Sequence, residues 1–299
     1  IGTAIQGVVH AEMGYQKSLA YAKDRVQFRS LSGPKNPNGP ADPIIWHPDV
    51  RRMLLTQKAF AEGGRMLLYY ASQLVDIDHY SDDEELKKNA NDLLALLTPI
   101  AKAFLTETGL ESANLGMQCF GGHGYIREWG LEQNVRDARI STLYEGTTGI
   151  QALDLLGRKV LMSQGETLKC FTKIIHKFCQ ANESNAAMKE FIEPLAALNK
   201  EWGEVTMHIG LTAMENQEEV SAASVDYLMY SGYITLAYFW ARAAEVALAQ
   251  GDSDDAHFYQ SKIKTARFYF QRLLPRTKSL LVTMKSGADN LMDFDLNEI

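Results

Sequence analysis

Residues 118–151 read QCFGGHGYIREWGLEQNVRDARISTLYEGTTGIQ, and this stretch decides how the rest of the chain is interpreted. Its glycines at positions 121, 122 and 124 lie between segments of helical pattern. Glycine permits a positive φ and lets backbone N–H groups approach a ligand closely, and such a turn before a helix can bind an anion. The spacing is GGxG and no strand precedes it, so it is not a dinucleotide-binding fingerprint. From these glycines alone, a plain tight turn and a phosphate-binding loop both remain open.

Glu145 stands out in the second half of the same stretch. It lies between Tyr144 and Gly146, directly before Thr147. A carboxylate at a glycine-flanked break can project into a cavity, and an apolar cavity makes it a stronger base, suited to removing a proton next to a carbonyl. The alternative is a structural acid at the start of a helix, with Thr147 as the N-cap.

Arg25 is the candidate anion-binding residue near the end of the first helical segment. It stands in the sequence DRVQF, residues 24–28. A guanidinium there can bind a phosphate in a bidentate manner. It can equally form a surface ion pair that complements the negative end of the helix dipole.

Three helices are predicted before the glycine-rich stretch, because apolar residues recur there at helical spacing. A loop rich in glycine and proline separates the first helix from the second, since proline cannot continue a helix. A serine followed by acidic residues begins the third helix and complements its dipole. The predicted segments are about 2–27, about 48–76, and from Ser81 through Phe104 with a kink at Pro99; glycines and aromatics interrupt the pattern over 116–130.

After that interruption the pattern is helical again, from near Gln133 with a short break at Gly146, and four more helices are predicted over about 151–284. Their breaks fall at 182–184, 215–217 and 251–254. Long amphipathic helices with short polar connections pack antiparallel, and no segment alternates as a strand would. The predicted fold is therefore all-α: an antiparallel helical bundle over 1–162 and a second helical bundle, a C-terminal extension, over 163–299.

Composition narrows the class of function. The chain has 299 residues with a formal net charge of −7, which disfavours a nucleic-acid surface. The three cysteines form no CxxC pair or zinc spacing with a histidine, so we expect a reducing, cytoplasmic location and no metal. No run of about eighteen apolar residues indicates a transmembrane segment, and no signal peptide is visible. The chain begins inside a helical pattern without Met, which suggests a piece of a longer protein.

Four motifs in order change the interpretation of the single residues. They are RxQF at 25–28, QCFGGxGY at 118–125, RDARI at 136–140 and YEGT at 144–147. This order resembles the acyl-CoA dehydrogenase family, and the segments GTAIQG at 2–7 and YAKDR at 21–25 are similar to the first helix of that family's C-terminal helical domain. The resemblance covers about residues 1–160 strongly. The remainder resembles, more loosely, the helical extension of longer bacterial members.

The resemblance implies a function and a set of site residues. Family members bind FAD and remove two hydrogens from an acyl-CoA thioester, and electrons pass to an electron-transfer flavoprotein. By this resemblance Glu145 is the base that takes the α-proton, and Tyr144 and Gly146 line the acyl pocket. The residues that match FAD contacts are Thr147 near the flavin phosphates, Arg25, Gln27 and Phe28 toward the FAD of a neighbouring subunit, and Gln118, Gly121 and Gly122 near its adenosine half. Two FAD half-sites in one helical domain imply a homodimer or a dimer of dimers.

Two departures from the family pattern limit what is carried over. Position 149 is glycine, where many members have a longer polar residue, and the loop over 33–45 is longer than in short members. The N-terminal helical domain and the middle β-domain, which holds the flavin ring, have no counterpart in this sequence. We therefore expect the chain alone to bind FAD poorly and to turn over little substrate.

Three alternatives stay open. An acyl-CoA oxidase would pass electrons to oxygen. A dehydrogenase-like helical module could bind nucleic acid through the basic residues of 262–278, although the surrounding region is acidic. The aromatic stripe of 258–274 indicates core or interface packing, which makes the extension an oligomerisation module, or else a peripheral membrane contact.

Overall fold

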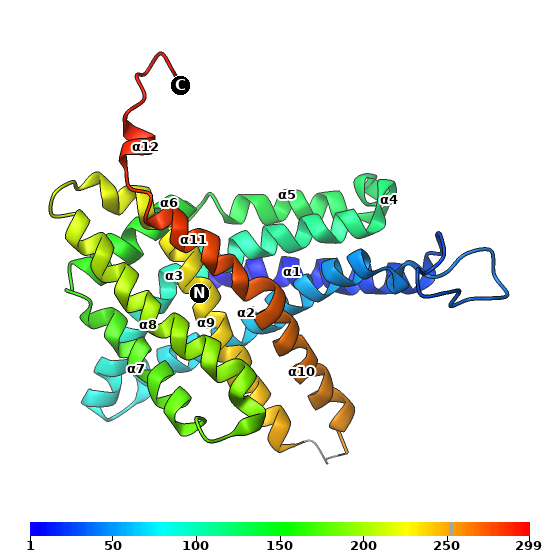
Figure 1. Cartoon of the computed structure of the whole chain (residues 1–299), viewed down its shortest axis with the longest axis horizontal. Helices are drawn as coiled ribbons and strands as arrows, with labels where there is room; N and C mark the ends of the chain where they lie inside the picture. The colour runs from blue at the N-terminus through cyan, green and yellow to red at the C-terminus, as the bar shows by residue number, and fades with distance from the viewer. Residues whose placement is uncertain (251–253) are drawn as a thin grey trace. The chain divides into compact units, whose positions relative to one another are not determined.

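The computed structural model describes residues 1–250 and 254–299 and contains only helices and their connections (Figure 1). Within these ranges no strand forms, and one isolated bridge pairs Val26 with Pro43. The predicted all-α class is confirmed. Three residues of the predicted break at 251–254 lie outside the described residues.

Nine α-helices of eight residues or more carry the fold in the described ranges. They are α1 (Gly2–Asp24), α2 (Pro48–Tyr80), α3 (Glu84–Phe120), α5 (Leu131–Ser141), α7 (Glu166–Ala181), α8 (Lys189–Thr212), α9 (Glu218–Ala249), α10 (Ala256–Phe268) and α11 (Thr277–Met284). The shorter α-helices are α4 (Gly122–Tyr125), α6 (Thr148–Leu153) and α12 (Asp289–Met292). Single 3₁₀ turns form η1 (Ile44–Trp46), η2 (Arg127–Trp129), η4 (Ala186–Met188) and η6 (Leu274–Arg276), and π-helical turns form η3 (Asp154–Leu161) and η5 (Tyr269–Leu273).

The largest difference from the sequence-based expectation is at Gly116. The helical pattern was expected to stop there, but α3 continues to Phe120 with Pro99 inside it. The glycines of α3 serve close packing and not a turn: a Cβ on Gly116 would lie 3.1 Å from the Cα of Gly14. The break at Gly146 is also longer than expected, since residues 142–147 are not helical.

The chain forms two compact units, which we call the N-terminal unit (Gly2–Arg65 and Leu105–Glu145) and the C-terminal unit (Ile1, Met66–Phe104 and Gly146–Ile299). In the N-terminal unit, α1 and α3 touch through their backbones. A Cβ on Gly7 would lie 2.1 Å from the carbonyl oxygen of Leu105, and one on Gly109 would lie 2.5 Å from that of Gly7. Because a side chain at these positions has no room, the two helices cross at backbone contact.

In the C-terminal unit, α9 is the central helix. All residues from Tyr230 to Ala241 are buried, so more than three turns are covered on every side. The helices that pack against α9 include α6, α8, α10 and α11. Tyr269, Phe270, Leu273 and Leu274 are buried, which confirms core packing for this part of the aromatic stripe, whereas Phe258 is exposed.

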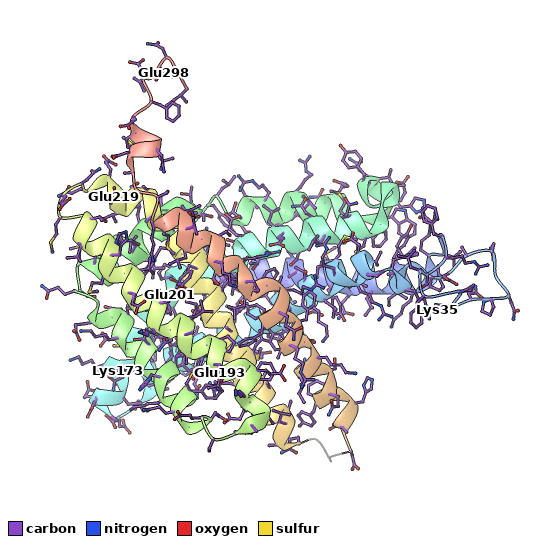
Figure 2. All side chains as sticks on the ribbon, in the orientation of Figure 1. Lys35, Lys173, Glu193, Glu201, Glu219 and Glu298 are labelled. Carbon is purple, nitrogen blue, oxygen red and sulfur yellow. The ribbon has the colours of Figure 1, made fainter. Side chains whose placement is uncertain are left out.

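The C-terminal segment that follows α11 extends outward from the helices of its own unit, and Figure 2 shows Glu298 near its tip. The predicted domain boundary between residues 162 and 163 falls in the turn after η3, where Gln164 and Gly165 both have positive φ. That boundary stays a prediction.

Among the described residues one helix, α3, is long and apolar enough by length and composition to cross a membrane. Of its most apolar eighteen-residue window, 72% is buried inside the protein. A buried core helix passes the same test, so this composition is weak support for a membrane span.

Candidate active site and cofactor-binding surface

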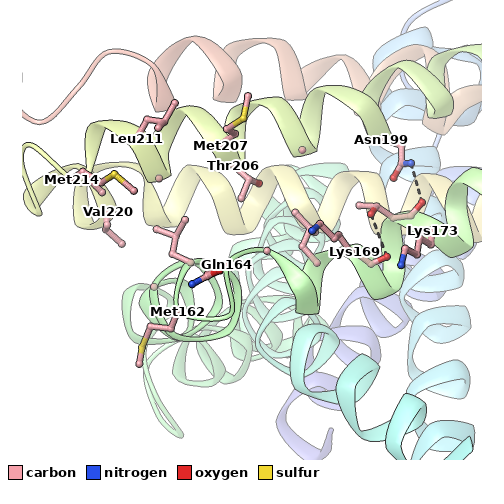
Figure 3. Close-up of a pocket in the computed structure, with 18 of the residues that line it drawn as sticks. Met162, Gln164, Lys169, Lys173, Asn199, Thr206, Met207, Leu211, Met214 and Val220 are labelled. Carbon is pink, nitrogen blue, oxygen red and sulfur yellow. Dashed lines mark hydrogen bonds between the residues drawn. The ribbon is translucent and has the colours of Figure 1, made fainter. Parts of the chain in front are cut away.

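We consider two cavities of the described part of the chain as sites. The larger, about 1220 Å³, lies in the C-terminal unit between η3, α7 and α8 (Figure 3). None of the predicted site residues lines it. The smaller, about 520 Å³, lies in the N-terminal unit, and six predicted residues line it: Arg25, Gln27, Phe28, Gln118, Gly121 and Gly122. The fold thus brings Phe28 and Gln118, which are 90 positions apart in the sequence, to one cavity.

The end of α3 forms one wall of the smaller cavity. The turn begins at Gly121, whose φ of 58° favours glycine. The ring of Phe120 stacks on Tyr21 with centroids 4.0 Å apart, and the Tyr21 hydroxyl is 2.8 Å from Nδ1 of His123. A Cβ built on Gly121 or Gly122 meets no atom within 4 Å, so a ligand has open access to this backbone.

Cys119 also lines this cavity. Burial raises the pKa of the Cys119 thiol to about 11. The thiol therefore stays protonated near neutral pH, when it is a poor nucleophile.

The segment after α1 also lines this cavity, and it is held by a short antiparallel ladder. The N–H of Gln27 donates to the carbonyl of Asp42 at 2.9 Å, and the N–H of Asp42 donates to that of Phe28 at 2.8 Å. The N–H of Ile44 donates to the carbonyl of Arg25 at 2.8 Å. Phe28 is exposed and has a φ of 57°, a conformation that costs energy in a non-glycine residue. Such strain is found at ligand sites more often than elsewhere.

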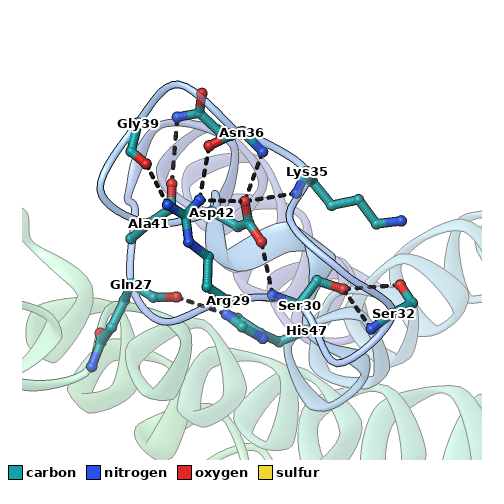
Figure 4. A network of polar contacts seen from close by, with 10 residues as sticks. All are labelled: Gln27, Arg29, Ser30, Ser32, Lys35, Asn36, Gly39, Ala41, Asp42 and His47. Carbon is teal, nitrogen blue, oxygen red and sulfur yellow. Dashed lines mark hydrogen bonds and ion pairs between the residues drawn. The ribbon is translucent and has the colours of Figure 1, made fainter.

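Asp42 organises the loop that carries this ladder (Figure 4). Its buried carboxylate accepts hydrogen bonds from the backbone N–H groups of Ser30 at 2.8 Å, Lys35 at 2.8 Å and Asn36 at 2.7 Å. Arg29 adds an ion pair at 3.3 Å. Burial by itself would raise the pKa of Asp42, but these donors lower it to about 2. Asp42 has no motif in the sequence that marks it. The long loop over 33–45 is an ordered support for residues 25–28.

The predicted base lies in a separate loop, residues 142–147. Glu145 is exposed and has a φ of 58°, and Gly146 follows with a φ of 89°. The hydroxyl of Tyr144 donates to Oε1 of Gln6 on α1. The apolar cavity that would make Glu145 a stronger base is therefore not formed by the described residues around it.

After Glu145 the chain is held by α3 and α6. Nζ of Lys102, a buried residue of α3, donates to the carbonyl oxygen of Gly146 at 2.6 Å. Thr147 is the N-cap of α6, and its hydroxyl accepts from the N–H of Ile150 at 3.3 Å. Sequence reasoning missed Lys102, because a single lysine within an apolar helix gives no motif.

The predicted site residues of the N-terminal unit fall into two groups. Tyr144 bonds to Gln6 near the start of α1, whereas Arg25 follows the end of α1. From Gln6 to Asp24 the helix is roughly 27 Å long. Within one chain, Tyr144 and Arg25 are therefore too far apart to contact the same part of a bound ligand.

The described ranges contain no cluster of side chains that could bind a metal ion. There, no group of three or more His, Cys, Asp or Glu residues is placed to hold an ion. The three cysteines are free.

Comparison with known proteins gives matches along the chain. The family model "Acyl-CoA dehydrogenase, C-terminal domain" matches residues 1–161, and "Acetyl-CoA dehydrogenase C-terminal like" matches residues 171–295. The chain is 39% identical to 3-methylmercaptopropionyl-CoA dehydrogenase of Ruegeria pomeroyi over 98% of its own length and 49% of that protein. It is 32% identical to the broad-specificity linear acyl-CoA dehydrogenase FadE5 of Mycobacterium tuberculosis, over 99% and 50%.

Among solved structures, an acyl-CoA dehydrogenase of Bacillus anthracis complexed with FAD matches with a TM-score of 0.71 at 18% identity, over 95% of this chain and 48% of that one. At that identity the likeness concerns the fold. The chain spans about half the length of the curated relatives it matches.

Proposed function

Because this chain belongs to the acyl-CoA dehydrogenase family, we propose that the protein removes two hydrogens from an acyl-CoA thioester to give the 2-enoyl-CoA. The observation that carries the proposal is the conformation of Glu145. A glutamate in the left-handed region, exposed and followed by a left-handed glycine, is held in a costly backbone that a surface acid does not require.

Glu145 is the residue we assign as the base. The α-proton of a thioester is weakly acidic, so its removal needs a carboxylate placed directly against it. The loop fixes the backbone on both sides of Glu145: Tyr144 is bonded to Gln6, and the carbonyl of Gly146 accepts from Lys102. Tyr144 and Gly146 then line the acyl group on either side of the base. The exposure of Glu145 leaves its carboxylate accessible to the substrate and to walls supplied by other parts of the enzyme.

FAD supplies the hydride acceptor of the reaction. The smaller cavity suits a nucleotide cofactor, since Arg25, Gln27 and Gln118 are among its lining residues and the backbone at Gly121 and Gly122 is open. Phe28 offers an exposed ring at its edge. Thr147 accepts one hydrogen bond and still has its hydroxyl hydrogen to donate, so it can bind a phosphate next to the base.

The two groups of residues support an assembly of at least two copies. Tyr144, next to the base, bonds to Gln6 near the start of α1, whereas the Arg25 cavity lies at the end of the same helix. We infer that each chain contributes its base and Thr147 to one FAD, and its Arg25 cavity to the FAD of a neighbouring copy. The electron acceptor we propose is an electron-transfer flavoprotein, and the free cysteines favour a cytoplasmic location.

The same division implies that residues 1–299 alone hold FAD weakly and turn over little acyl-CoA. An absorbance spectrum of the purified chain tests this. Stoichiometric flavin absorption would contradict it.

The function itself is tested with Glu145→Gln in the FAD-loaded enzyme. Glutamine keeps the size and removes the base, so we expect dehydrogenation to fall by roughly 10²-fold or more with FAD absorbance retained. Glu183→Gln, an exposed acid in the turn after α7, is the matched control. Unchanged turnover of the Glu145 variant would refute the assignment, and peroxide formation without an electron-transfer flavoprotein would identify an oxidase.

A further inference from the structure

The larger cavity is an open groove between α7 and α8, unused by the proposed reaction (Figure 3). Met162, Met207 and Met214 line it with 78%, 64% and 83% of their surface exposed. Flexible, polarizable methionines at this exposure are typical of surfaces that bind another chain. Because the groove is not enclosed, a polypeptide fits it better than a free acyl chain, which needs enclosure.

The chemistry of the groove changes along its length. Met214, Met162 and Val220 lie at one end, and Lys173 and Asn199 lie at the other (Figure 3). Among the described lining residues, the ionisable side chains are Lys169, Lys173 and His176, and none is acidic. Lys169 is ion-paired with the exposed Glu166. The groove therefore favours an occupant that is apolar at one end and acidic at the other.

Asn199 lines the polar end of the groove and carries an acceptor that has no donor among the described residues. Its Nδ2 donates to the carbonyl of Thr172 at 3.0 Å, but its Oδ1 is buried without a hydrogen-bond partner. A buried acceptor left without a donor costs free energy. A peptide backbone can supply the missing N–H, whereas a hydrocarbon chain cannot.

The chain carries a segment of matching chemistry at 289–299. It contains the acids Asp289, Asp293, Asp295 and Glu298 and no lysine or arginine. Its apolar side chains are largely exposed: Leu291, Met292, Phe294, Leu296 and Ile299, at 57%, 59%, 55%, 89% and 89%. The segment extends away from the helices of its own unit (Figures 1 and 2), so these side chains have no place in that core.

The segment 289–299 begins next to the apolar end of the groove. The N–H of Ala288 donates to Oε1 of Glu219 at 3.0 Å, and the adjacent Val220 lines the groove beside Met214. From Asn199 to Met214 the groove wall is roughly 22 Å long. The seven residues that follow α12, 293–299, span up to about 23 Å when they are extended. The start of the segment and the apolar end of the groove are therefore neighbours. If a two-fold axis passes close to them, each of two copies can place its segment in the groove of the other.

We propose that residues 289–299 of one copy lie in the α7–α8 groove of a second copy, and the reverse. Phe294 packs against the methionines, Asp295 and Glu298 reach Lys169 and Lys173, and a backbone N–H of the segment donates to Asn199. This contact deepens the assembly of copies proposed above and rests on it, but it needs neither FAD nor Glu145.

Photo-crosslinking tests the contact directly. Phe294 is replaced with p-benzoylphenylalanine, which inserts into nearby C–H bonds, and the irradiated protein is analysed on a denaturing gel and by peptide mapping. We expect a covalent dimer whose new bond joins position 294 to a peptide carrying Met162, Met207 or Met214. Tyr80, 81% exposed in the same unit, is the matched control position and should give no dimer.

Other outcomes overturn the proposal. A monomer with an internal crosslink means that the segment occupies its own groove, and a crosslink elsewhere or none means that the groove is not its site. Lys169→Glu with Lys173→Glu should lower the dimer yield about tenfold, and adding Asp295→Lys with Glu298→Lys should restore it. Failure of this restoration refutes the pairing of charges. Glu145→Gln should leave the yield unchanged, so this result is independent of the catalytic assignment.

Discussion

Lys102 donates a hydrogen bond from Nζ to the carbonyl oxygen of Gly146 at 2.6 Å. The lysine is buried in α3, and the glycine follows the proposed base directly. A buried ammonium costs free energy unless it is well bonded, so this lysine is better explained by the position of the loop than by the stability of the core. We regard Lys102 as a positioning residue for Glu145.

Replacing Lys102 with methionine tests this role. Methionine keeps most of the apolar stem and removes the donor, so the backbone after Glu145 loses one of its supports. We expect kcat of the FAD-loaded enzyme to fall by roughly 10- to 100-fold, because small displacements of a reacting group are costly. Lys88→Met, at an exposed position of the same helix, is the control. Equal kcat for the two variants would show that Lys102 serves only the fold.

Arg25→Met tests the smaller cavity as a cofactor surface. A charge-assisted hydrogen bond is worth about 1.5–3 kcal/mol, so we expect the dissociation constant for FAD to rise about tenfold or more. Arg25→Lys should give an intermediate dissociation constant for FAD, since lysine keeps the charge but lacks the paired N–H donors of the guanidinium. Arg272→Met, an exposed arginine outside the cavity, should leave FAD titrations unchanged. Equal affinity for Arg25→Met and the wild type would remove Arg25 from the site.

Asp42 makes the loop of residues 29–42 sensitive to acid. Its pKa is lowered from 3.8 to about 2 by hydrogen bonds to the carboxylate, despite its burial. A lowered pKa means that the stabilisation is fully present above pH 3.8 and is lost as the pH falls toward 2. Pepsin, which is active across this range, should therefore cut near the exposed Leu31 much faster at pH 2 than at pH 4.

Asp42→Asn is the variant that separates this loop from general acid unfolding. It removes the charge at every pH, so cleavage at pH 4 should already be about tenfold faster than in the wild type. Sites outside residues 28–42 should be cut at the wild-type rate at pH 4. Equal protection of the loop in both proteins at pH 4 would show that the carboxylate does not hold it.

Two glycines in the C-terminal unit give a matched pair for stability. A Cβ on Gly232 of α9 would lie 2.1 Å from Cδ2 of Phe104, which is fully buried and packs edge-to-face on Tyr233. Gly232→Ala should therefore lower the free energy of unfolding by about 1–3 kcal/mol. Gly203→Ala in α8 meets no atom within 4 Å and should raise it by up to about 1 kcal/mol. Denaturant titration measures both, and the same sign for both would contradict the packing.

The sequence was informative where residue type and backbone conformation are tightly coupled. The turn at Gly121 and the break before Thr147 followed from glycine and from capping chemistry, and both are present. Gly116 looked the same in sequence but serves a helix crossing, because its role depends on Gly14, about 100 residues earlier. Local pattern cannot distinguish a glycine needed for φ from one needed for space.

Asp42 and Lys102 were out of reach for the same physical reason. Each acts through backbone atoms: Asp42 accepts from three N–H groups and Lys102 donates to a carbonyl. Every residue type offers a backbone carbonyl, and nearly every type offers a backbone N–H, so the partner residues carry no side chain that marks the contact. Neither contact therefore forms a sequence motif. The order of the YEGT and RxQF motifs could be read from the sequence. That Tyr144 lies near the start of α1 and Arg25 at its end could not be read from it.

The backbone contact between α1 and α3 makes the length of α1 a fixed dimension of the enzyme. Gly7 and Gly14 must face Gly109 and Gly116, Gln6 must meet Tyr144, and Arg25 must emerge at the far end. One residue inserted between Gly14 and Arg25 would turn everything beyond it by about 100° and shift it by about 1.5 Å. The helix thus fixes the spacing between the proposed base and the proposed cofactor surface at Arg25, and this spacing can change only if both ends of the helix are rebuilt.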